Sequence, residues 1–327
     1  MTTIASTGTR KGGAPKVTAV VLGWNHSEDT LECIASLKET TGAPLHILYV
    51  DNGSTEDEVR RVLDGAPGVS VIRHEHNVGV SRGFNAGLAY ALRHGADFIF
   101  MANNDTLMDP DSLRLLLDAA TRYPDAGILV PKIYYHEAPE VLWSAGSRFR
   151  RFPPAIIMNK TKGPDDGRYD TLGTLEFTTL CTVLLRADAL RKSGLMDPNF
   201  LFYFEDYDLA LRIREGGYTI RLVPEARTRH KVARVTRAGS GSPAFWTTSG
   251  RSARIFARRH GARHRWLAGP CLIAYLALRA MAEGGWRGIS CFAKGLGEAR
   301  EMPLRPVPPG DGSETDPVTA MRQVGPA

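Results

Sequence analysis

The chain has 327 residues, 43% of them hydrophobic and 23% charged, an ordinary composition for a globular protein with one large or two modest domains. Its four cysteines show no CxxC spacing, which argues against a zinc knuckle or a disulfide framework and favours a reducing, cytoplasmic setting. The net charge of +6 is concentrated between residues 227 and 265, which hold eleven Lys or Arg and no Asp or Glu, so either an anionic partner or a solvated basic face explains it.

Both ends of the chain are predicted to be disordered tails. Residues 1–15 contain basic and small residues but no apolar stretch of the kind that a secretory signal needs. Residues 301–327 are rich in Pro, Gly, Ser and Asp, which favour disorder. We therefore expect a folded domain over residues 16–235, followed by a basic and amphipathic helical region over residues 236–300.

Short apolar runs alternate with amphipathic stretches along the first 135 residues. The runs are typical of buried strands, and the stretches between them carry helix signals such as Ser27 as an N-cap and Gly95 as a stop. Residues 132–175 are expected to be largely irregular. The predicted strands cover residues 17–22, 45–50, 69–74, 97–102, 127–135 and 218–223, with another strand and a short helix within 175–194 and a helix starting near Glu205.

This alternation with short connections predicts an α/β fold with a mostly parallel, doubly wound sheet and helices on both faces. In such sheets ligands bind at the carboxyl ends of the strands. A surface turn explains any single polar strand end, but four such ends at one edge of the sheet predict a shared crevice. The strand ends carry Trp24 and Asn25, then Asp51, then Asn77, and then Asn103, Asn104 and Asp105.

Several residues near these strand ends have a structural alternative. Asp51 can bond a nucleobase or ribose, or can serve an Asx-turn or helix cap. The glycines within residues 77–87 allow close approach of a ligand or of a neighbouring element, and they form neither GxGxxG nor a P-loop. Arg82 and Asn85 in that stretch are better explained by a ligand than by packing. Asp105 suits one hard divalent cation whose other ligands are phosphate oxygens and water.

The stretch YFEDYDLALR places three carboxylates at a predicted helix start, directly after a run of aromatic residues. Asp208 and Arg212 form an ordinary i,i+4 pair, which accounts for Asp208. Glu205 and Asp206 have apolar neighbours, which raise the pKa of a carboxyl group and suit it to accept a proton. His230, at the start of the basic segment, is by itself more often a structural residue than a ligand.

Together these stretches resemble the family 2 glycosyltransferases with a GT-A fold, particularly their rhamnosyltransferase-like branch. The similarity covers residues 16–260 and rests on the order and spacing of VVLGWN, YVDNGS, NVGVSRGFNAGL, MANNDTLMDPDSL, WSAG, MDPNFLFYFEDYDLALRIREGGY and PEARTRH. The resemblance implies inverting transfer of a sugar, rhamnose or another hexose, from a dTDP- or UDP-sugar to an acceptor hydroxyl. The acceptor classes open to it are a lipid-linked glycan, a polysaccharide and a small metabolite.

The resemblance also implies roles for individual residues. Asp206 would be the general base, with Glu205 orienting the base or the acceptor. Asp105 would bind Mg²⁺ or Mn²⁺ as the carboxylate of a DxD-type motif, with His230 as a second contributor to metal or diphosphate. The donor would lie against Trp24, Asn25, Asp51, Asn77, Gly79, Arg82, Asn85, Asn103 and Asn104, and the acceptor against Trp143, Tyr203 and Phe204.

Three positions depart from the family pattern. The metal motif reads Asn103-Asn104-Asp105 and lacks its first carboxylate, as the rhamnosyltransferase-like branch often does. Trp24 stands where a Tyr is usual, and it can still stack beside the base. Cys181 occupies a position that is often small or Gly.

The apolar stretch over residues 266–278 is too short to span a bilayer, and Arg279 ends it. It predicts either a buried core helix or, with the basic segment before it, a helix lying on an anionic membrane surface. In the second case the protein would be peripheral at the inner face of the cell membrane.

Other classes of protein fit the sequence less well. A sugar-phosphate nucleotidyltransferase would carry an early Gly-rich loop with Arg and Lys, which LGWNHSEDT lacks, and a dehydrogenase would carry GxGxxG. No recognition motif accompanies the basic segment, so no nucleic-acid partner is expected. A non-catalytic sugar-nucleotide-binding module and a homodimer are left open.

Overall fold

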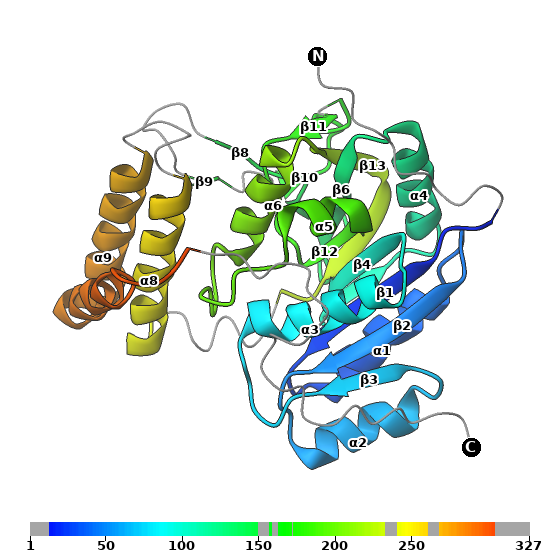
Figure 1. Cartoon of the computed structure of the whole chain (residues 1–327), viewed down its shortest axis with the longest axis horizontal. Helices are drawn as coiled ribbons and strands as arrows, with labels where there is room; N and C mark the ends of the chain where they lie inside the picture. Colours follow the sequence, from blue (N-terminus) through cyan, green and yellow to red (C-terminus); the bar gives the residue numbers. More distant parts are fainter. Residues whose placement is uncertain are drawn as a thin grey trace.

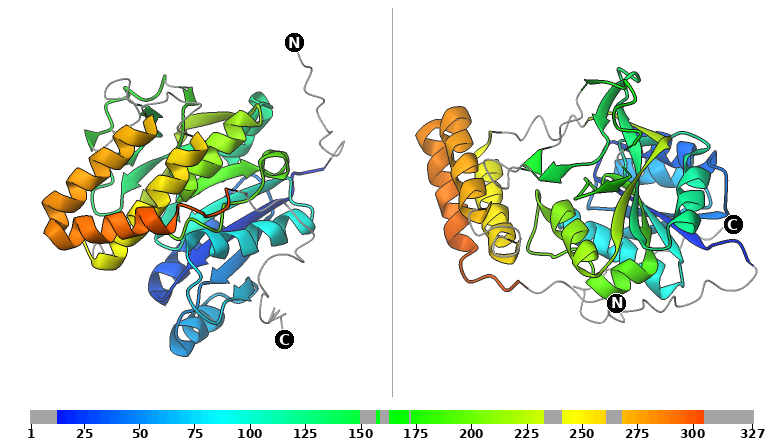
Figure 2. Two further views of the ribbon diagram at one scale, coloured as in Figure 1. Left: turned by 60° about the vertical axis from the view of Figure 1, so that its left-hand side comes forward. Right: turned by 90° about the horizontal axis from the view of Figure 1, so that it is seen from above.

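A computed structural model describes residues 13–149, 157–158, 163–171, 173–232, 241–260 and 268–304. The two predicted tails lie almost wholly outside these ranges. One large mixed sheet has helices on both faces, and two long helices stand beside it (Figures 1 and 2), so the predicted α/β class with a C-terminal helical extension is confirmed.

The first four strands form a parallel half-sheet, as predicted, and their order is β3-β2-β1-β4. Its register places Gly23 beside Asp51 and Leu22 beside Asn103, so the polar strand ends meet at one edge. The elements are β1 (Val17–Gly23), α1 (Ser27–Lys38), β2 (Leu45–Asp51), α2 (Glu56–Gly65), β3 (Ser70–Arg73), α3 (Val80–Arg93) and β4 (Phe98–Asn103).

The second half of the sheet is mixed, and its strand order does not follow the chain. The strand predicted over residues 127–135 is β6 (Ala126–Tyr135), but β12 (Thr182–Arg186) lies between it and β4 and is antiparallel to both. β13 (Thr219–His230) is longer than predicted because it pairs with β6 along one side and with β5 (Thr106–Met108) near its end. Strand order depends on pairing between distant segments, which a local apolar pattern does not record.

The stretch predicted to be irregular contains several short strands, and three helices complete the sheet's cover. These elements are β7 (Val141–Ser144), β8 (Arg148–Phe149), β9 (Ile157–Met158), β10 (Gly163–Pro164), β11 (Thr174–Leu175), α4 (Ser112–Arg122), α5 (Ala187–Ser193) and α6 (Glu205–Glu215).

Each face of the sheet has its own apolar core, with α3, α5 and α6 on one side and α1, α2 and α4 on the other. The helix α3 packs closely on the sheet because two of its residues are glycines. A Cβ on Gly87 would lie 2.3 Å from Val20 Cγ1, and one on Gly83 would lie 2.6 Å from Leu22 Cδ1. These glycines therefore serve packing, which was one of the two alternatives that the sequence left open.

The helices α8 (Pro243–His260) and α9 (Ala268–Glu298) form a third core that also includes Phe200 and Leu211 of the sheet-bearing part. α9 bends sharply at Gly285, whose φ of 58° is non-helical (Figure 2). Where the two helices cross, a Cβ on Gly295 would lie 1.9 Å from the Thr247 carbonyl oxygen, so only glycine allows this approach.

The arginines of α8 are used inside the molecule. Arg254 and Arg258 donate hydrogen bonds to the backbone carbonyls of Leu296 and Ala299, at 3.1 and 2.9 Å. Arg259 pairs with two buried aspartates. Much of the predicted basic face is therefore structural, and it ties α8 to α9 and to the sheet-bearing part.

Candidate active site

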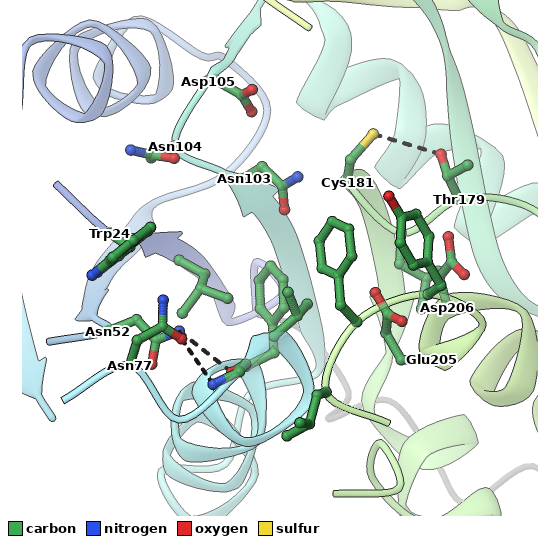
Figure 3. Close-up of a pocket in the computed structure, with 18 of the residues that line it drawn as sticks. Trp24, Asn52, Asn77, Asn103, Asn104, Asp105, Thr179, Cys181, Glu205 and Asp206 are labelled. Atoms are coloured by element: carbon green, nitrogen blue, oxygen red, sulfur yellow. Dashed lines mark hydrogen bonds between the residues drawn. The ribbon is translucent and has the colours of Figure 1, made fainter. Parts of the chain in front are cut away.

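A cavity of about 1040 Å³ lies at the carboxyl edge of the parallel strands, where the sequence predicted a crevice. Its walls come from the ends of β1 and β4, the start of α3, the segment 201–204 before α6, and the start of α8. Figure 3 shows the polar strand ends on one side of this cavity, with Glu205 and Asp206 on the other.

The strand-end side carries an exposed indole beside paired amides. Trp24 is 41% exposed. Asn52 donates to the Asn77 side-chain oxygen at 3.2 Å and accepts from the backbone N–H of Val78 at 3.1 Å. Asn52 was not among the predicted site residues, although its place directly after a strand end was a usable signal.

Asp51 is turned into the protein, and neither Asp51 nor the half-buried Asn25 lines the cavity. Asp51 is fully buried and accepts hydrogen bonds from the Ser54 N–H at 3.1 Å and from Arg73 Nε at 3.2 Å. Asn25 accepts from the backbone N–H of Thr55 at 3.2 Å. Both side chains hold the loops at the strand ends, which for Asp51 agrees with the turn alternative, and their predicted donor contacts stay predictions.

Asn85 and Arg82 do not line the cavity either, and their predicted ligand contacts stay predictions. Asn85 is buried and uses both ends of its amide on the backbone of Met196, with bonds of 2.8 and 3.0 Å. It thereby joins α3 to the loop that leads to α6. Arg82 is exposed and lies outside the cavity wall. A helical spacing in the sequence does not tell which face of α3 meets the cavity.

Asp105 and His230 meet at the end of β4, as predicted, with His230 Nε2 at 3.1 Å from Asp105 Oδ1. The edge of the His230 ring meets Trp143, with ring centroids 4.7 Å apart. His230 Nδ1 is buried and has no hydrogen-bond partner among the described residues. One carboxylate and one imidazole are donors that fit a single divalent cation taking its remaining ligands from phosphate oxygens and water. Within the described ranges, no group of three or more such side chains occurs.

The opposite wall presents Glu205 and Asp206 at the start of α6. The segment before them is held in an unusual backbone conformation, because Tyr203 and Phe204 have φ of 69° and 70°. Tyr203 packs on Phe245 of α8, with ring centroids 5.3 Å apart, and Phe204 packs on Phe256 at 5.2 Å. The segment 201–204, which packs on α8, therefore directs the two acids into the cavity.

Both acids have a raised pKa. Burial raises the pKa of Glu205, and the nearby carboxyls of Asp206 and Asp208 raise it further. Burial also raises the pKa of Asp206, against the lowering effect of backbone N–H groups such as that of Tyr207, which donates to Asp206 Oδ1 at 2.8 Å. Glu205 Oε2 is buried without a hydrogen-bond partner among the described residues. This pair is suited to take up a proton near neutral pH.

Asp208 lies one turn into the same helix, but its surroundings lower its pKa instead of raising it. The predicted pair with Arg212 is present at 2.8 Å, and Asp208 also accepts from Arg259 at 2.6 Å and from His260 at 3.0 Å. Burial alone would raise the pKa of Asp208, but Arg212, His260 and Arg259 together hold it well below the usual range. Arg259 and His260 therefore lock α6 to the end of α8, while Arg212 pairs with Asp208 within α6.

Comparison with known proteins identifies the family of this chain. A family model described as "Glycosyl transferase family 2" matches residues 18–193, which is more than half of the chain. The chain belongs to glycosyltransferase family 2. This family 2 glycosyltransferase is 28% identical over 225 residues to an N-acetylglucosaminyl-diphospho-decaprenol L-rhamnosyltransferase of Mycobacterium tuberculosis, covering 62% of this chain and 72% of the relative. A galactofuranosyltransferase of the same species is 31% identical over 110 residues, which cover 33% of this chain and 36% of that protein.

A solved structure also resembles this glycosyltransferase. The mannosyltransferase of Pyrobaculum calidifontis, in complex with GDP-Man and Mn²⁺, superposes with a TM-score of 0.52 and 18% identity, covering 88% of this chain and 75% of that one. This likeness confirms the predicted GT-A fold. The rhamnosyltransferase-like assignment made from the sequence motifs is confirmed by the family match and the mycobacterial relative.

Proposed function

We propose that this family 2 glycosyltransferase moves a sugar, rhamnose or another hexose, from a nucleotide-diphosphate donor to an acceptor hydroxyl with inversion, and that Asp206 is the general base. The observation that carries the proposal is one cavity with Asp105 and His230 at its strand-end wall and Glu205 and Asp206 opposite. Donor phosphates at the first wall would leave the sugar facing the second.

The strand-end wall supports a nucleotide-sugar site. The exposed face of Trp24 can stack on a base, and the amides of Asn52 and Asn77 offer polar contacts beside it. Asp105 and His230 would hold a divalent cation, which when bound supplies positive charge against the diphosphate leaving group. The presence of GDP-Man and Mn²⁺ in the structurally similar mannosyltransferase supports both assignments.

The opposite wall supports an acceptor with apolar parts. Leu201 and Phe202 are among the more exposed large apolar residues of the described chain, and they line the cavity with Tyr203, Phe204 and Phe245. The name of the mycobacterial relative includes a decaprenol-linked acceptor. These two observations favour a lipid-linked glycan over a small metabolite.

In the proposed reaction the acceptor oxygen attacks the anomeric carbon while its proton passes to the Asp206 carboxylate. The bond between that carbon and the diphosphate oxygen breaks on the opposite face, and the nucleoside diphosphate leaves. Glu205 orients the base or the acceptor through its buried carboxyl. Base catalysis of this kind contributes about 10²–10⁴-fold to the rate.

The raised pKa of the two acids predicts the pH dependence. Only the ionised carboxylate accepts a proton, so kcat/KM is expected to fall as the pH drops through the raised pKa of the Glu205–Asp206 pair. The acid limb should lie at least about one pH unit above the value near 4 of an ordinary carboxyl group. A pH–rate profile measured at saturating metal checks this, and a flat profile down to the ordinary carboxyl range would remove Asp206 from the role of base.

A donor screen tests the proposal as a whole. Calorimetric binding of dTDP-, UDP- and GDP-sugars, with and without Mn²⁺ or Mg²⁺, should identify one nucleotide class that binds best in the presence of a divalent ion. In the Asp105→Asn variant the metal-dependent part of the affinity is expected to drop by about tenfold or more, because the carboxylate that His230 contacts becomes neutral. No binding of any donor would overturn the proposal, and equal metal dependence in the variant would remove Asp105.

A further inference from the structure

The first segment of α9, residues 268–284, is apolar on two opposite faces. Its inner stripe, Leu272, Leu276 and Ala280, packs in the core shared with α8. Its only charged residues, Arg279 and Glu283, pair with each other at 2.8 Å on the flank. A helix that is apolar all round normally has both faces covered, yet α8 covers only one of them.

The outer stripe of this segment is exposed. Tyr275 and Leu278 are 40% and 71% exposed, and Trp286, directly after the bend at Gly285, is 82% exposed. Apart from residues that line the cavity, these three are the exposed large hydrophobic side chains of the described residues. Figures 1 and 2 place α9 on the outside of the helix pair, away from the sheet. None of the described helices is long and apolar enough to cross a bilayer. We therefore consider contact with the surface of a bilayer.

The charge of this region distinguishes between two candidate partners of the exposed face, a membrane and a second copy of the chain. Between residues 241 and 300 the sequence has ten Lys or Arg and two Asp or Glu, whereas the whole chain has an excess of only six positive charges. Several of these cations are bonded inside the molecule, but Arg287 is exposed, and the Lys294 side chain, 3.9 Å from Glu298, is 71% exposed. Two such surfaces repel each other, and an anionic bilayer attracts this one.

We propose that the outer face of α9, made of Tyr275, Leu278 and Trp286 with Arg287 and Lys294 beside it, docks on the surface of an anionic phospholipid bilayer. Leu278 and Trp286 enter the headgroup boundary, where an indole ring is well accommodated, and the cations meet lipid phosphates. The bend at Gly285 brings Trp286 to the corner of α9, where it is the most exposed of the three.

The bend of α9 is connected to the apolar end of the cavity through Trp246. A Cβ on Gly284 would lie 2.7 Å from Trp246 Nε1, so the buried indole of α8 packs directly at the bend of α9. Its chain neighbour Phe245 lines the cavity. The docking itself does not depend on the proposed function, but with that function it would present the cavity to an acceptor anchored in the same bilayer.

Vesicle co-sedimentation of the full chain tests the docking. Wild-type protein is expected to bind phosphatidylcholine vesicles containing phosphatidylglycerol and to bind pure phosphatidylcholine far more weakly, with binding weakened by added salt. The Leu278→Asp and Trp286→Ala variants are each expected to lower the partition coefficient by about tenfold, and the Arg287→Gln/Lys294→Gln variant by about the same factor. All three change exposed positions, so thermal unfolding should remain as in wild type.

Arg60→Gln on α2 is the matched control, since it removes one charge from an exposed residue on a distant helix (Figure 1) and should leave binding unchanged. Wild-type binding that ignores lipid charge, or variants that bind like wild type, would overturn the proposal. So would a concentration-dependent dimer in sedimentation equilibrium that Leu278→Asp dissolves, because a second copy would then be the occupant. Donor binding measured in the same preparations separates this result from a failure of the proposed function.

Discussion

Replacing Asp206 by Asn is expected to lower the rate of sugar transfer by about 10²–10⁴-fold while leaving donor affinity almost unchanged. The amide cannot accept the acceptor proton, but its size and its hydrogen bond from the Tyr207 N–H are retained. Initial rates and calorimetric donor binding, measured on the same preparation, give the two quantities. Asp118→Asn on the exposed surface of α4 is the control, and it should alter neither. Full activity in Asp206→Asn would remove this residue from catalysis.

The same substitution should not destabilise the fold. A carboxyl group whose pKa is raised in the folded state contributes stability while protonated at low pH, and that contribution is lost as the pH rises through the raised value. Asn stays neutral at every pH. Above the raised pKa, the Asp206→Asn variant should therefore be at least as stable as wild type, which makes its loss of activity a catalytic effect.

Replacing Asp208 by Asn, two residues further along α6, is expected to lower the free energy of unfolding by about 3–5 kcal/mol. Asp208 is fully buried, and the change removes the carboxylate that Arg212 bonds and one of the two that Arg259 bonds. Because its pKa is lowered in the folded state, the stability that wild-type Asp208 contributes is present above the ordinary carboxyl pKa and is lost as the pH falls.

Denaturant unfolding near neutral pH measures this effect. Asp188→Asn, which breaks an exposed pair with Arg191 on α5, is the matched control and should change stability by no more than about 0.5 kcal/mol. An Asp208→Asn variant as stable as that control would show that the buried ion network does not hold α6 to α8.

The parallel half of the fold was predictable because each of its strands is a short apolar run between clear helix signals. The place of β12 between β4 and β6 was not, since nothing in the run of residues 182–186 encodes which strands it joins. The role of α8 was missed for a related reason. Its arginines look like a basic surface in sequence, yet Arg259 lies within reach of two buried aspartates that are far away along the chain.

For the side chains of the candidate site, prediction from the sequence had the same limit. Strand ends were good predictors, because parallel strands bring Trp24, Asn77 and Asp105 to one edge whatever the loops do. The direction in which each polar side chain points was less predictable. Asp51 and Asn85 stand in the predicted segments, but each turns inward to satisfy buried backbone or guanidinium groups. Which polar residue faces the ligand depends on partners that only the folded chain supplies.

A crystal structure of the Asp206→Asn variant with its best-binding nucleotide-sugar would test the account most directly. We expect the base beside Trp24, the diphosphate next to Asp105 and His230, and the anomeric carbon between the diphosphate and residue 206. A donor bound elsewhere on the molecule, or one whose sugar points away from α6, would contradict the account.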